Sequence, residues 1–164
     1  MRTSSRSILL LSVAVVCAGC DQFTKSIAQT HLQMGETHSF LADTVRLQLA
    51  HNYGAFLSLG DSLPENWRHG LWSIGVGIVL IAILGYALFA KSLDRSLLLA
   101  LALIFAGGAS NLYDRIVYGG YVIDFMNVGI GWLRTGIFNV ADMGITTGAL
   151  LVLIGAFRPR AKPH

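Results

Sequence analysis

The chain has 164 residues, of which 54% are hydrophobic and only 13% are charged, and its mean hydropathy is +0.60. A typical soluble domain is about half apolar and about a quarter charged, so the shortage of charge is the informative departure. This composition excludes a disordered chain and indicates a membrane protein, with one integral-membrane domain over residues 1–164. Two cysteines are too few for a disulfide framework.

Four stretches of the chain are apolar enough to cross a membrane as helices. A hydrocarbon core of roughly 30 Å needs about 20 such residues per helix. The sequence predicts an all-α polytopic fold with four transmembrane spans, at about residues 7–25, 67–90, 96–114 and 137–157. Between them lie two longer loops and one short turn, at about residues 28–66, 115–136 and 91–95.

The basic residues predict how these spans are oriented. Seven of the twelve lie at one set of span ends, where the net charge is +6, while the rest of the chain carries −3. The positive-inside rule therefore places both termini and the turn Lys91–Arg95 in the cytoplasm. Because topology accounts for the net charge of +3, the sequence gives no support to nucleic-acid binding.

Both longer loops then lie outside the cytoplasm, and each contains a stretch with strand character. Residues Thr44–Ala50 alternate polar and apolar side chains, and Tyr121–Val128 is a second run of strand-forming residues. We expect a small β-rich element on the outer surface of the membrane. Ser62-Leu-Pro-Glu65 resembles a capping box for the second span, with Trp67 and Trp72 at interfacial depth.

Polar residues within the spans are the strongest functional signal, because ionisable groups are costly in a bilayer and usually face a protein interior. At 1.5 Å per residue, Asp21 and Asn111 lie about 21 Å and about 22 Å from the inner ends of their spans. Asp142 lies about 7–8 Å below the outer end of the fourth span. Three helices thus place polar groups in one layer near the outer surface.

Further polar residues extend this layer along the same helices. Lys25 follows Asp21 by one turn, and Asp114 with Arg115 follows Asn111. Interfacial ion pairs, Asp21 with Lys25 and Asp114 with Arg115, are the purely structural alternative. Similarly, Asn139 could cap the fourth helix, with Asp142 in its first turn. The convergence of these groups at one depth favours a functional site.

Asp124 stands apart because it lies between Ile123 and Phe125 in an apolar stretch. It could be an exposed carboxylate on an edge strand. If the loop folds back over the helices, Asp124 meets Asp142, and two close carboxylates share one proton. The ionised member can activate a water while the protonated member polarises a carbonyl, which is aspartyl-protease chemistry without a metal or other cofactor.

Other chemistries have weaker support in the sequence. Four of the five histidines, at positions 31, 38, 51 and 69, lie outside the predicted spans and lack metal-ligand spacing, so we expect no metal site. Cys17-Ala-Gly-Cys20 lies in an apolar helix and is interpreted as packing, although after Arg2 and Arg6 it also resembles a lipobox whose Cys20 would be lipidated. Small residues of the third and fourth spans are interpreted as helix-packing positions: Gly107, Gly108, Ala109, Gly144 and Gly148.

Taken together, five short motifs in this order resemble those of lipoprotein signal peptidase (signal peptidase II), an aspartyl protease family of the bacterial inner membrane. The motifs are Asp21-Gln22-x-x-Lys25, Asn52-x-Gly54-Ala55, Gly108-x-x-Asn111-x-x-Asp114-Arg115, Val122-Ile123-Asp124-Phe125 and Phe138-Asn139-Val-Ala141-Asp142. The resemblance covers nearly the whole chain.

The resemblance implies a substrate and a role for each matching residue. The substrate is a prolipoprotein that carries diacylglycerol on its lipobox cysteine, and cleavage occurs just before that cysteine. Asp124 and Asp142 would form the catalytic dyad near the periplasmic face, and Asn111, Arg115 and Asn139 would position the dyad or the substrate. Asp21, Lys25, Asn52 and Gly54 would support the site. The family is inhibited by the antibiotics globomycin and myxovirescin.

A small proton-coupled transporter is the rival interpretation, because intramembrane Asp, Asn and Arg residues can also relay protons. Transporters of that kind typically show internal repeats and broken helices near the bilayer centre. The sequence shows no such repeat, and its polar layer lies near one surface. A single chain supplies every expected group, so we expect a monomer.

Overall fold

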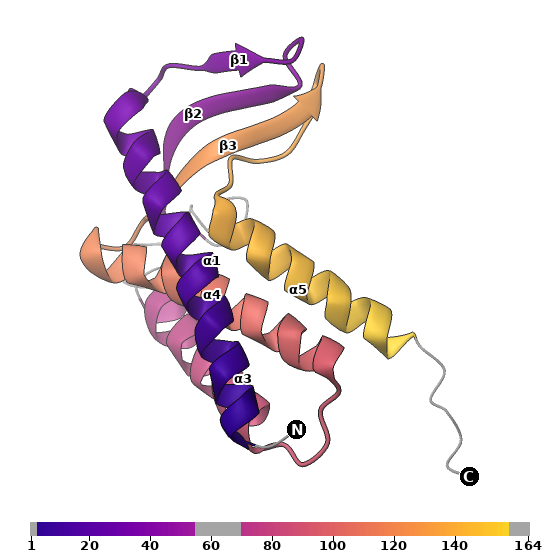
Figure 1. The fold of residues 1–164 in the computed structure, drawn as a ribbon. Helices are drawn as coiled ribbons and strands as arrows, with labels where there is room; N and C mark the ends of the chain where they lie inside the picture. The colour runs from indigo at the N-terminus through magenta and orange to yellow at the C-terminus, as the bar shows by residue number, and fades with distance from the viewer. Residues whose placement is uncertain (1–2, 55–69, 158–164) are drawn as a thin grey trace.

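The computed structural model describes residues 3–54 and 70–157, and it is mostly helical with a small antiparallel sheet (Figure 1). In chain order the elements are α1 (Thr3–His31), β1 (His38–Phe40), β2 (Val45–Asn52), the π-helical turn η2 (Gly70–Gly75), α3 (Val76–Phe89), α4 (Arg95–Val117), β3 (Val122–Ile130), β4 (Leu133–Arg134) and α5 (Val140–Ala156).

Two helices of the described chain are long and apolar enough to cross a membrane, α1 over Ser4–His31 and α4 over Arg95–Val117. The apolar helices Ser73–Phe89 and Val140–Ala156 are shorter. Each predicted span thus coincides with an apolar helix, although the predicted capping box and Trp67 lie outside the described residues. Helix α1 extends beyond residue 25, the predicted end of the first span, through Ala28 to His31, because no glycine or proline interrupts the helix before Gly35.

The two predicted strands are confirmed and pair with each other. β2 and β3 are antiparallel, with Val45 opposite Val128 and Asn52 opposite Val122. The sheet order is β1-β2-β3-β4. The outer strands β1 and β4 have only three and two residues, too few for an alternating pattern to reveal them. The sheet therefore joins the two longer loops, which are about 70 residues apart in the sequence.

Helix α4 lies at the centre of the helical part and contacts α1, α3 and α5. Small residues on α4 allow this, since Ala100, Ala102 and Ala106 are fully buried. A Cβ atom at Gly148 of α5 would lie 2.6 Å from the backbone oxygen of Ala100. The packing role predicted for Gly107, Gly108 and Gly148 is confirmed, because a side chain at each of these positions would meet a neighbouring helix.

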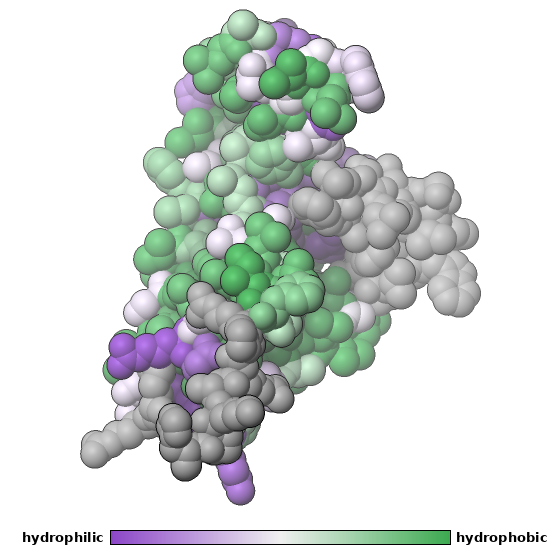
Figure 2. Space-filling view, turned by 90° about the vertical axis from the view of Figure 1, so that its right-hand side faces the viewer, coloured by the Kyte–Doolittle hydropathy of each residue, from purple (hydrophilic) through white to green (hydrophobic). Residues whose placement is uncertain are grey.

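The helical surface is apolar, as the broad hydrophobic area of Figure 2 shows. Large exposed side chains on α1 and α3 include Leu11, Val15, Ile78 and Ile81. The sheet lies at one end of the helices, and the N-terminal end of α1 lies at the other, beside the α3–α4 connection (Figure 1). There, buried Arg6 donates a 2.5 Å hydrogen bond to the carbonyl of Ala90, the C-cap residue of α3.

Candidate active site

The start of α5 places two of the predicted site residues. Asn139 is the N-cap residue, and its side chain accepts a hydrogen bond from the backbone N–H of Asp142 at 2.9 Å. The Asp142 carboxylate accepts one in return from the backbone N–H of Asn139, at 3.2 Å. This reciprocal pair is a capping box, so the predicted capping role of Asn139 is confirmed.

Strand β3 brings Asp124 to the same place. Its side chain is 1% exposed, and that of Asp142 is 6% exposed, so the edge-strand alternative for Asp124 is wrong. The Asn139 amide that caps α5 also donates a 2.6 Å hydrogen bond to Asp124. One asparagine thus contacts both aspartates, the arrangement expected if the loop folds back over the helices.

Two more asparagines complete the contacts of the carboxylates. Asn52, at the end of β2, donates to Asp124 at 2.9 Å, and Asn111 of α4 donates to Asp142 at 2.9 Å. Together with Asn139, they give each of the four carboxylate oxygens an N–H donor. These donors stabilise negative charge, yet they leave lone pairs free for a proton or a water.

Burial, together with the nearby charge of Asp142, nevertheless raises the pKa of Asp124 to about 7, against the lowering effect of the hydrogen bonds from Asn52 and Asn139. A carboxyl group with a pKa near neutrality can hold a proton at physiological pH and still release it. This is a property of catalytic acids and bases rather than of surface aspartates.

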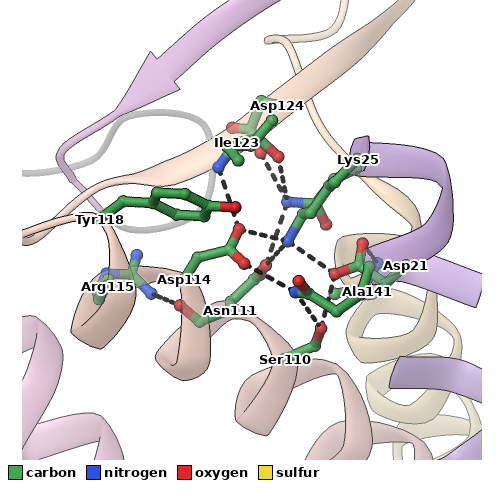
Figure 3. Close-up of polar contacts among 12 residues, drawn as sticks. Asp21, Lys25, Ser110, Asn111, Asp114, Arg115, Tyr118, Ile123, Asp124 and Ala141 are labelled. Atoms are coloured by element: carbon green, nitrogen blue, oxygen red, sulfur yellow. Dashed lines mark hydrogen bonds and ion pairs between the residues drawn. The ribbon is translucent and has the colours of Figure 1, made fainter. Parts of the chain in front are cut away.

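Three charged side chains, Asp21, Lys25 and Asp114, form a group that is here called the ion cluster (Figure 3). Lys25 forms ion pairs of 2.7 Å with both Asp21 and Asp114, and all three side chains are at most 1% exposed. The predicted pair of Asp21 with Lys25 is therefore present, but it is buried rather than interfacial. Asp114 pairs with Lys25, and not with Arg115 as the structural alternative supposed.

The ion cluster connects four elements of the fold. Asp21 of α1 accepts hydrogen bonds from the Ala141 backbone N–H at the start of α5, at 2.8 Å, and from Ser110 of α4, at 2.7 Å. Asp114 accepts from the Ile123 backbone N–H of β3 at 3.2 Å. The cluster therefore fixes β3 and α5, the two elements that carry Asp124 and Asp142, against the helices.

Arg115 links the site to the exit of β2. Its guanidinium donates to the backbone oxygen of Gly54 at 2.7 Å, while the Gly54 N–H donates to the side chain of Asn52 at 3.0 Å. Arg115 is 8% exposed and also donates to the backbone oxygen of Asn111 at 3.3 Å. The loop residues Asn52 and Gly54 are thus held beside Asp124.

The structure brings all nine predicted site residues into one connected network, whose members are Asp21, Lys25, Asn52, Gly54, Asn111, Arg115, Asp124, Asn139 and Asp142. Sequence reasoning missed Ser110 and the role of Gln22, which donates to Ser110 and Asp114 at 3.0 Å and 2.7 Å. A polar residue next to Asn111 in an apolar span was the available signal for Ser110. Among the described residues, no cluster of His, Cys, Asp or Glu could hold a metal ion.

Comparison with known proteins identifies the family. Residues 13–158 match the family model described as signal peptidase (SPase) II. The chain belongs to the signal peptidase II family. Similar relatives include lipoprotein signal peptidases from Cupriavidus taiwanensis, 32% identical over 98% of this chain and 89% of the relative, and from Psychromonas ingrahamii, 36% identical over 93% and 87%.

Solved structures agree with this assignment. A structure described as a bacterial membrane enzyme superposes with a TM-score of 0.80 and 25% identity, over 94% of each chain. A second one with the same description gives a TM-score of 0.75, over 91% of this chain and 92% of the other. Membership of signal peptidase II makes the chain a hydrolase, a protease of the aspartic type, and its apolar helices fit a membrane protein.

Proposed function

We propose that this signal peptidase II removes the signal peptide from diacylglyceryl-modified prolipoproteins, cleaving before the lipidated cysteine with a water activated by Asp124 and Asp142. The observation that carries the proposal is the pair of buried carboxylates from β3 and α5, joined through Asn139. Relatives of the chain along most of its length are lipoprotein signal peptidases, which supports the substrate class.

The chemistry needs one proton on the pair. The ionised carboxylate takes a proton from a water, whose oxygen attacks the scissile carbonyl carbon. The protonated carboxyl group gives its proton to the carbonyl oxygen, and a tetrahedral diol forms. The carboxyl group that took the water proton gives it to the leaving nitrogen, the other carboxylate takes a proton back from a hydroxyl of the diol, and the C–N bond breaks to give the new carboxylic acid and amine. The pair is then in its starting state. Asn111, Arg115 and Asn139 hold this geometry or the substrate backbone, while Asp21, Lys25, Asn52 and Gly54 support it.

We further propose that residues 1–164 form one integral-membrane domain with four spans in the inner membrane and both termini in the cytoplasm. The site then lies near the periplasmic face, where a diacylated cysteine is held by its acyl chains. Exposed apolar side chains at the far end of the sheet, which include Leu41, Ile130 and Trp132, suit a sheet that rests on the membrane surface. The enzyme acts as a monomer and is inhibited by globomycin-type and myxovirescin-type antibiotics.

A gel-shift cleavage assay tests the proposed reaction. Purified protein is given a diacylglyceryl-modified prolipoprotein or the same precursor without lipid. Wild-type protein should cleave only the lipidated form. Asp124→Asn and Asp142→Asn should each lower the rate by at least about a thousandfold while remaining folded, because each removes one half of the proton transfer.

Ser92→Ala, at an exposed position between α3 and α4, is the matched control and should retain full activity. Substantial cleavage by either aspartate variant would remove that residue from the catalytic role. A chelator should not change the rate, and loss of activity on chelation would indicate a metal mechanism instead. No cleavage by folded wild-type protein would favour a transporter or a binding protein.

A further inference from the structure

We propose that Lys25 is a positioning residue that makes Asp142 the ionised member of the pair and leaves the proton on Asp124, by orienting the side-chain amide of Asn111. This inference rests on the proposed function. Lys25 donates to the Asn111 side-chain oxygen at 3.0 Å, and the Asn111 side-chain nitrogen donates to Asp142 at 2.9 Å.

The orientation of an asparagine amide is determined by neighbours that can play only one hydrogen-bonding role. A lysine ammonium donates and cannot accept. Whichever end of the Asn111 amide faces Lys25 must therefore be the oxygen, and the N–H₂ end must face the opposite way, toward Asp142. Figure 3 shows Lys25 and Asn111 in contact beside Asp114.

Asn139 also donates to the Asn111 oxygen, at 3.1 Å, but it cannot secure the orientation alone. Its two amide hydrogens face three acceptors, since it also lies 2.6 Å from Asp124 and 3.3 Å from the Ile123 carbonyl. The ammonium of Lys25, in contrast, has three hydrogens for three acceptors, which are Asp21, Asp114 and Asn111. Lys25 is thus the fully committed donor.

The two aspartates differ in how well their surroundings stabilise negative charge. Asp142 is in the first turn of α5, where the helix N-terminus favours an anion, and it accepts one backbone N–H besides the Asn111 amide. Asp124 lies on a strand, without a helix terminus, and is more deeply buried. Each carboxylate accepts two N–H donors, so the helix terminus and the shallower burial favour the charge on Asp142 and the proton on Asp124, and the Asn111 contact stabilises that charge.

Several charged groups surround Asp142 within the described residues, so the test must separate orientation from charge. They are Asp21 and Lys25 of α1, Arg115 of α4 and Asp124 of β3, while Asp114 of α4 is paired with Lys25. Removing Lys25 alone would change the charge of the ion cluster from −1 to −2. The double variant Lys25→Met/Asp114→Asn keeps the charge at −1 while it removes the donor to Asn111, together with the ion pairs of Lys25.

The experiment measures the pH profile of kcat with lipidated substrate. In Lys25→Met/Asp114→Asn the acid limb, which reports ionisation of the base, should move up by about one pH unit, and kcat should fall about 10- to 100-fold, as expected for a lost hydrogen bond to a charged carboxylate. Asp114→Asn alone is the matched control. It keeps the Lys25–Asn111 contact, so its acid limb should stay at the wild-type position or below it.

Adding Asn111→Ala distinguishes an effect of Lys25 that passes through the Asn111 amide from a direct electrostatic effect of its charge on Asp142. In that background, Lys25→Met/Asp114→Asn should shift the acid limb no further than Asp114→Asn does. A double variant with the wild-type profile, or a shift that persists without the Asn111 amide, would overturn the inference. If the double variant does not fold, Asn111→Ala alone tests the inference. An acid limb of Asn111→Ala at the wild-type position would contradict the proposed role of the Asn111 amide.

The wild-type protein provides the remaining comparison. Absence of cleavage of lipidated substrate by folded wild-type protein would contradict the proposed function, and the inference would fall with it. Cleavage by the wild-type protein together with unmoved profiles in the variants would contradict the role of Lys25 alone.

Discussion

At the scale of single residues, Asn139 has two roles that sequence reasoning treated as alternatives. Its oxygen caps α5 by accepting the Asp142 N–H, and its nitrogen donates to Asp124. The two roles depend on each other, because a backbone N–H can only donate and so forces the amide nitrogen toward Asp124. Asn52 shows the same arrangement, with its oxygen on the Gly54 N–H and its nitrogen on Asp124.

The raised pKa of Asp124 predicts how activity depends on pH. Its folded-state pKa of about 7 lies above the ordinary value of 3.8, so the group is protonated below pH 7 and loses the proton as the pH rises through 7. If Asp124 supplies the proton to the carbonyl oxygen, kcat should fall about tenfold per pH unit above about 7.

Cleavage of lipidated substrate in buffers from pH 6 to 9 measures this limb. Re-assay at pH 6.5 after incubation at pH 9 controls for unfolding and should recover the full rate. A rate that stays flat or rises up to pH 9 would show that the protonated form of Asp124 is not required.

At the scale of elements, the distance between α4 and α5 depends on glycine. Gly148 allows the two backbones to approach, and a Cβ there would lie 2.6 Å from the Ala100 oxygen and 2.7 Å from Ile104. Gly155 lies about two helical turns further along α5, and a Cβ atom there would have nothing within 4 Å. The same substitution therefore meets backbone at one site and open space at the other.

We expect Gly148→Ala to lower the free energy of unfolding by about 1–3 kcal/mol, because the added methyl group forces α4 and α5 apart. Gly155→Ala, the matched control, should change it by less than about 1 kcal/mol, since alanine is the better helix former. Unfolding midpoints in detergent measure both. Equal effects of the two substitutions would mean that helix propensity, and not packing between α4 and α5, determines the result.

Elements with a long periodic or apolar pattern could be predicted from the sequence, and short or tertiary features could not. The four apolar helices and strands β2 and β3 were found because hydrophobic runs and alternation report burial directly. β1 and β4 carry no such pattern. Arg6 was counted as a cytoplasmic charge, but it is 5% exposed and bonds the end of α3, a contact between residues 84 positions apart.

At the scale of the whole molecule, the depth of each polar residue could be predicted from its position in a span, but its partner could not. Depth follows from the rise per residue of a helix, whereas partners depend on how helices rotate against each other. This is why the structural alternative pairs Asp114 with its neighbour Arg115, although Asp114 pairs with Lys25, and why the sequence does not reveal the role of Ser110. The residues of the site were predictable, but the hydrogen bonds that orient them were not.

The proposed topology makes a prediction for the whole chain. Residues at the sheet end and at the α3–α4 connection should lie on opposite sides of the membrane, because the excess of basic residues keeps the connection in the cytoplasm. In a protein with Cys17 and Cys20 replaced by alanine, Glu36→Cys near the sheet and Ser92→Cys between α3 and α4 supply one thiol each, both at exposed positions.

A membrane-impermeant thiol reagent applied to spheroplasts should label Glu36→Cys at once and Ser92→Cys only after permeabilisation. Retained cleavage activity controls for native insertion. The reverse labelling would place the site at the cytoplasmic face, where a translocated lipidated cysteine could not reach it, and labelling of both thiols in intact spheroplasts would contradict a membrane crossing between them.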